Sequence, residues 1–137
     1  MKIDNEKKTL VTGDRGKDVL EFTRIHCPRM AFLWPEIEDD LPCTRKYIMQ
    51  KTVEMLQNDF PVWIATMHEI PLLAMGWMCR NNRLDAKNVQ LIYVREDGWN
   101  NVLLDKNGDI LDYFWVSEDW EIGFRLRFDL ISEEDFV

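Results

Sequence analysis

Apolar and polar positions alternate most regularly in the second half of the chain. Residues 89–96 form an apolar run typical of a strand, and residues 101–115 predict a hairpin around Asn107-Gly108, a pair preferred in two-residue turns. Residues 122–130 alternate apolar and polar side chains with a period of two, which predicts another strand with one solvated face. Together these segments predict an antiparallel meander.

A two-residue turn at Asn107-Gly108 also predicts the register of the hairpin. It pairs Lys106 with Asp109 and places Leu104 opposite Leu111. Asp105 then lies on the opposite face of the hairpin from these leucines.

The first half of the chain predicts one long helix, over residues 41–58. Its apolar positions recur at helical spacing on one face, while charged and amide side chains occupy the other. The predicted inward-facing residues are Ile48, Met49, Thr52, Val53, Leu56 and Phe60.

Shorter segments of the first half favour strands. Residues 19–26 place Leu20 and Phe22 at a period of two, and residues 30–34 and 62–65 are rich in apolar and β-branched side chains. Residues 72–79 are apolar on every side, so this run is either a strand or a short buried helix.

These elements predict a single α+β domain over residues 1–137. Its core is an antiparallel sheet of about five to seven strands, ending in the C-terminal meander, with one main amphipathic helix packed on one face. Residues 1–18 are mostly polar and predict an arm or edge strand followed by a turn, and residues 132–137 predict a frayed acidic tail.

Charge narrows the classes of partner. The formal net charge is −8, and from Glu96 onward 12 acidic residues face only three basic ones. Such a balance disfavours direct contact with nucleic acid or an anionic membrane surface.

The cysteines and the N-terminus bear on the compartment. Cys27, Cys43 and Cys79 are odd in number and widely spaced, which is not the pattern of a disulfide framework and favours a reducing compartment. No secretory signal and no apolar stretch of membrane-spanning length is found, so we expect a cytoplasmic protein.

Motifs for cofactors and metals are incomplete. Residues 13–18 have two glycines and a lysine, as in a phosphate-binding loop, but two residues separate the glycines where four are needed, and Asp18 replaces the magnesium-binding Ser or Thr. Residues 105–109 begin like a calcium loop that then fails at Ile110. We therefore interpret residues 13–18 as a turn, and the sequence predicts neither a cofactor nor a metal ligand set.

The strongest functional pattern is a run of acidic side chains interleaved with aromatic ones. Carboxylates beside Trp and Tyr anchors suit a surface that docks on a basic partner protein, for example one that normally binds nucleic acid. The residues of this predicted acidic surface are Asp109, Asp112, Tyr113, Trp115, Glu118, Asp119, Trp120 and Glu121.

The sequence thus predicts a small acidic binding protein that inhibits or neutralises its partner, the mechanism of phage anti-defence proteins and toxin-neutralising immunity proteins. A plainer interpretation is that the acids only keep a Trp-rich sheet soluble. One alternative is a nucleotide- or ligand-processing enzyme with a pocket between the helix and the Trp63–Trp77 region, and another is an assembly subunit that associates through residues 70–78.

Overall fold

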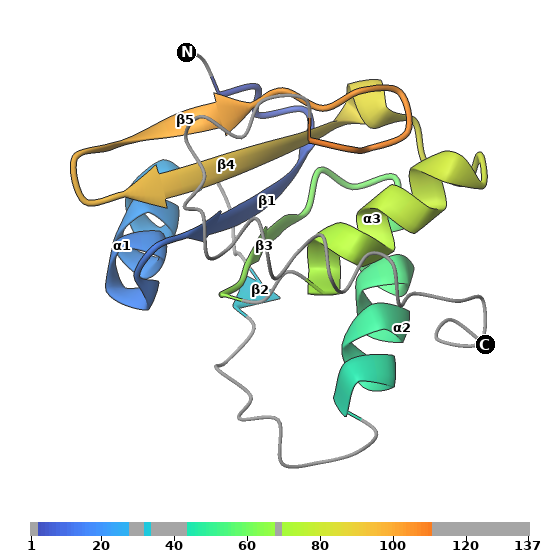
Figure 1. The fold of residues 1–137 in the computed structure, drawn as a ribbon, viewed down its shortest axis with the longest axis horizontal. Helices are drawn as coiled ribbons and strands as arrows, with labels where there is room; N and C mark the ends of the chain where they lie inside the picture. The colour runs from blue at the N-terminus through green and yellow to red at the C-terminus, as the bar shows by residue number, and fades with distance from the viewer. Residues whose placement is uncertain (1–2, 28–31, 34–43, 68–69, 111–137) are drawn as a thin grey trace.

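The structure, a computed structural model, describes residues 3–27, 32–33, 44–67 and 70–110 (Figure 1). Within these residues the chain alternates strands and helices, in the order β1-α1-β2-α2-β3-α3, and ends with a short 3₁₀ turn, β4 and β5. Such alternation is typical of a parallel α/β sheet.

The sheet has the strand order β2-β3-β1-β4-β5. β1 (Lys8–Gly13) lies between β3 (Trp63–Ala65) and β4 (Val89–Arg95) and is parallel to both. β2 (Phe32–Leu33) is parallel to β3, whereas β5 (Gly98–Val102) is antiparallel to β4. The predicted antiparallel sheet of five to seven strands is therefore wrong, because this sheet is mixed and mainly parallel.

Burial on both faces explains the parallel arrangement. In β1 and β4 adjacent residues are buried, although their side chains point to opposite faces of the sheet. Strands covered on both sides are typical of parallel sheets, whose crossover helices lie on the faces.

Three helices, and not one, cover the sheet within the described residues. α1 (Gly16–His26) packs on one face, where Val19 and Phe22 contact the cluster that contains Val11. α2 (Thr44–Leu56) and α3 (Ile70–Arg80) pack against each other on the opposite face. No helix among the described ranges is long and apolar enough to cross a membrane.

The helix predicted over residues 41–58 is confirmed as α2. Ile48, Met49, Thr52 and Leu56 are buried, as the spacing predicted, but Phe60 lies beyond the end of the helix and is 54% exposed. The ambiguous run at 72–79 is resolved as helix α3, which is buried from Ile70 to Cys79.

Two predictions in the N-terminal segment are wrong. Residues 19–26 belong to helix α1, because Val19, Phe22 and Thr23 recur at helical spacing and are buried while Leu20 is 49% exposed. Residues 8–13 form the central strand of the sheet and not an edge strand or arm.

The strand predicted at 89–96 is confirmed as β4, but the register of the following turn is wrong. The structure pairs Leu104 with Ile110, and Asp105 N donates to Asp109 O. Three residues therefore close the turn, with Gly108 at a φ of 76°, which is the geometry of a three-residue loop with a bulge. The Asp105 carboxylate accepts from the backbone N–H groups of Asn107 and Asp109, which stabilises this turn.

Candidate functional site

The connections of the sheet separate at the carboxyl ends of β1 and β3. After β1 the chain passes over one face through α1 toward β2, and after β3 it passes over the other face through α3 toward β4. Open α/β sheets bind ligands in the crevice at such a switch point, outside the carboxyl ends of the strands. We call the residues that follow β1 and flank it here, namely Gly13 to Asp18 with Tyr93 and Arg95, the carboxyl-edge site.

The link between β1 and α1 in this site is short and closely packed. Gly13 ends β1, Asp14 and Arg15 form the link, and α1 begins at Gly16. A Cβ on Gly13 would overlap the carbonyl oxygen of Val94 in β4, so only glycine fits. The segment that the sequence predicted to be a turn thus joins a central parallel strand to the N-terminus of a helix.

Charged side chains of both signs surround this link. The Tyr93 hydroxyl donates to Asp14, and Arg95 Nε lies 3.9 Å from the other Asp14 carboxylate oxygen. Arg15 Nε donates to Asp18 at 2.8 Å, and this hydrogen bond raises the pKa of the Arg15 guanidinium. Arg15 is therefore held across the first turn of α1, where the carboxylate of Asp18 also complements the helix dipole.

Lys17 contributes the remaining positive charge of the carboxyl-edge site. It is exposed on the first turn of α1, and the ion pairs found within the described residues do not include it. Its ammonium group is therefore available to an anion from solution.

Thr12 precedes this site within β1 and is completely buried. Its hydroxyl has no hydrogen-bond partner among the residues that the structure describes. Thr12 pairs with Tyr93 in the β1–β4 register, so both side chains lie on the face that α2 and α3 cover. A buried hydroxyl without a partner costs stability.

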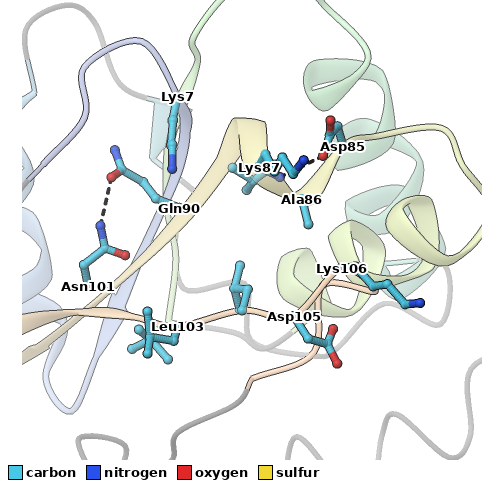
Figure 2. A pocket seen from close by; sticks show the side chains of 12 residues that line it. Lys7, Asp85, Ala86, Lys87, Gln90, Asn101, Leu103, Asp105 and Lys106 are labelled. Carbon is cyan, nitrogen blue, oxygen red and sulfur yellow. Dashed lines mark hydrogen bonds between the residues drawn. The ribbon is translucent and has the colours of Figure 1, made fainter.

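A second hollow lies at the opposite edge of the sheet, near the amino ends of β1 and β4. It has a volume of about 380 Å³ and lies between the 85–87 turn and the segment that follows β5 (Figure 2). We call it the amino-edge pocket; its lining includes Lys7, Asp85, Lys87, Gln90, Asn101, Val102, Leu103, Leu104, Asp105 and Lys106.

Gln90 forms the polar wall of the amino-edge pocket. Its amide nitrogen donates to Asp4 O and to Thr9 Oγ1, and its amide oxygen accepts from Asp4 N and Asn101 Nδ2. All the hydrogen-bonding capacity of this buried amide is thus used to hold the N-terminal segment on the sheet.

Asp109 is the only residue of the predicted acidic surface that the structure describes. It lies 3.3 Å from Arg80 of α3, and burial together with the neighbouring Asp105 raises the pKa of its carboxyl. Gly108 beside it packs so closely on Gly76 that an added Cβ would lie 3.1 Å from the Gly76 Cα. Asp109 therefore helps to dock the turn on α3, and the other seven residues of the predicted surface lie outside the described residues.

The alternative pocket and the predicted association surface correspond to buried regions. Trp63 is 2% exposed and Trp77 8%, and both belong to the core. Neither tryptophan lines the amino-edge pocket or the hollow beside Cys79 and Asp85, and residues 70–78 are buried in the core. Within the described ranges, no three His, Cys, Asp or Glu side chains lie together as a metal site.

Sequence reasoning missed Asp14, Arg15, Lys17, Tyr93 and Arg95 as site residues. A signal for them was present in the Gly13–Lys17 segment, which directly follows an apolar run. A glycine-containing segment of this kind indicates an anion site only when a strand precedes it and a helix follows it. The spacing of the two glycines by itself predicts only a turn.

No family model matches this chain, and neither the curated proteins nor the solved structures contain a match.

Proposed function

We propose that this chain is a ligand-binding α/β domain that holds a phosphate-bearing small molecule, such as a nucleotide, at the carboxyl-edge site. The observation that carries the proposal is the position of the Gly13–Lys17 link, which joins the central parallel strand to a helix N-terminus where the connections of the sheet diverge. Both features favour anionic ligands.

The charges at the link support an anionic ligand. The first backbone N–H groups of a helix carry partial positive charge; Arg15 directly precedes α1, and Lys17 lies in its first turn. Arg95 adds a third cation at the end of the neighbouring strand. Both arginines already belong to ion pairs: Arg15 pairs with Asp18 and Glu96, and Arg95 with Asp14 and Asp97. Lys17 is the cation of this site that no ion pair within the described residues includes, so it carries most of the attraction for an anion.

The same residues argue against hydrolysis by a phosphate-binding loop. Two residues between the glycines leave a link that is too short to wrap a phosphate chain, and Asp18 replaces the hydroxyl that would bind magnesium. We therefore propose binding that does not need a divalent cation.

Isothermal titration calorimetry with ADP, AMP and GDP, each with magnesium and with EDTA, tests the proposal. We expect millimolar or tighter binding that does not depend on magnesium. Lys17→Ala should weaken it about tenfold, because a charged hydrogen bond to the phosphate is lost, and Asp18→Asn should strengthen it, because Arg15 is released.

Lys51→Ala is the matched control, because Lys51 lies on α2, on the opposite face of the sheet from α1, and belongs to neither candidate site. The absence of binding by all three nucleotides, or binding that Lys17→Ala leaves unchanged, would contradict the proposal.

A further inference from the structure

The amino-edge pocket concentrates positive charge in a strongly acidic protein. Lys7, Lys87 and Lys106 line it, although the formal net charge of the chain is −8. None of these ammonium groups belongs to an ion pair found within the described residues. Asp85 and Asp105 line the same hollow, so the lining has an excess of one positive charge.

The two carboxylates of the pocket are partly used by the backbone. One oxygen of Asp85 accepts from Lys87 N at 2.9 Å, and one oxygen of Asp105 accepts from Asn107 N and Asp109 N. These hydrogen bonds fix the turns on either side of the pocket. Each carboxylate is thus oriented by its own turn but keeps its negative charge, so an anionic ligand is attracted only by the excess of positive charge in the lining.

The remaining wall is apolar. Val102 and Leu104 contribute to it, and Leu103 is 65% exposed, which leaves a large aliphatic side chain at the opening. Figure 2 shows Leu103 on the wall opposite Lys7 and Lys87. The volume of about 380 Å³ lies within the range of small-molecule pockets.

We propose that the amino-edge pocket binds a small phosphate monoester that carries an apolar body, at a site separate from the carboxyl-edge site. The lysines hold the dianionic phosphate as point charges, and the apolar body covers Leu103 and its neighbours. The proposal does not depend on the proposed nucleotide site, because the two lie at opposite edges of the parallel strands.

Phenyl phosphate is the probe, because it combines a phosphate monoester and an apolar ring in one small molecule. It is titrated to about 10 mM into ¹⁵N-labelled protein, with inorganic phosphate and phenol as partial probes. We expect shifts of the amide signals of residues 85–90 and 101–106, and weaker binding of both partial probes.

The test variant is Lys87→Ala with Lys106→Ala, and it should bind phenyl phosphate at least about tenfold more weakly. Lys51→Ala on α2 is the matched control, because it removes a lysine distant from the pocket and should leave the affinity unchanged. If the double variant does not fold, Lys87→Gln alone serves, because it keeps most of the side chain and removes the charge.

Three outcomes overturn the proposal: no shifts at these residues, equal affinity of the double variant, or binding of phenol or inorganic phosphate as tight as that of phenyl phosphate. Shifts confined to residues 13–18 also overturn it, while supporting the proposed nucleotide site. Shifts at residues 85–90 and 101–106 without shifts at residues 13–18 would support the amino-edge pocket and give no support to the proposed nucleotide site. The two proposals can therefore fail separately.

Discussion

Replacing Thr12 with valine should stabilise the protein. Thr12 is completely buried in β1, and within the described part of the chain its hydroxyl has no hydrogen-bond partner. Valine has nearly the same shape and a higher preference for strands, so the substitution removes an unsatisfied polar group without creating a cavity.

Thr9 provides a matched control in the same strand. It is equally buried, but its hydroxyl donates to Lys7 O at 3.1 Å and accepts from Gln90 Nε2 at 2.8 Å. Thr9→Val removes both hydrogen bonds and leaves one N–H of the Gln90 amide buried without a partner. The expected change in the free energy of unfolding is a gain of about 1 kcal/mol for Thr12→Val and a loss of about 2 kcal/mol for Thr9→Val.

Urea unfolding followed by tryptophan fluorescence measures both changes. Trp63 is buried and pairs with Thr9 across the β1–β3 register, so its emission reports the loss of this part of the sheet. A thermal melt should show a rise of about 4 °C for Thr12→Val. A loss of more than about 1 kcal/mol for Thr12→Val, or equal losses for the two variants, would refute the argument that the Thr12 hydroxyl is unsatisfied.

Four further predictions follow from single contacts. Gly13→Ala should destabilise the protein by about 3 kcal/mol in urea unfolding, because its Cβ would overlap the Val94 carbonyl oxygen; a neutral result would contradict the close packing. Gly108→Ala should cost at least about 1 kcal/mol in the same assay, because Gly108 has a φ of 76° and contacts α3, and an unchanged midpoint would argue against that turn. Burial raises the pKa of the Asp109 carboxyl, so the folded protein holds this proton more tightly than the unfolded chain, and the parent loses stability as the pH rises through the folded pKa. Asn does not titrate, so the free energy of unfolding of Asp109→Asn relative to the parent should increase from about pH 3 to pH 6. A decrease over the same range would contradict this. Burial raises the pKa of the Cys79 thiol to about 11, so iodoacetamide mapped by mass spectrometry at pH 8 should label Cys27 well before Cys79, and equal rates would exclude the buried position.

The elements with strong local signals were predictable. The i, i+4, i+7 spacing of Met49, Val53 and Leu56 identified α2, and the apolar run at 89–96 identified β4. The period-two prediction for residues 19–26 failed because Phe22 fits two patterns, with Leu20 at strand spacing and with Val19 at helical spacing. The burial of Val19 and the exposure of Leu20 show that the helical pattern is the correct one.

The candidate sites are formed by residues that are distant in the sequence and close in space, and the spacing of residues along the chain does not show such contacts. Asp14 and Tyr93 are 79 positions apart, and they meet because β1 and β4 are adjacent and parallel. Lys7 and Lys106 likewise line one pocket from distant segments. By contrast, the Asp105 turn is local, but its three-residue form depends on the carboxylate that accepts two backbone N–H groups.

The sequence by itself determined which segments are apolar enough to be buried and which of them have helical spacing, because both properties depend on near neighbours along the chain. Only the tertiary structure decided that residues 8–13 form the central strand and that the sheet is mainly parallel. Strand order is a choice among pairings of comparable local energy, and it depends on which helix covers which face. The edges where ligands are proposed to bind exist only after that choice is made.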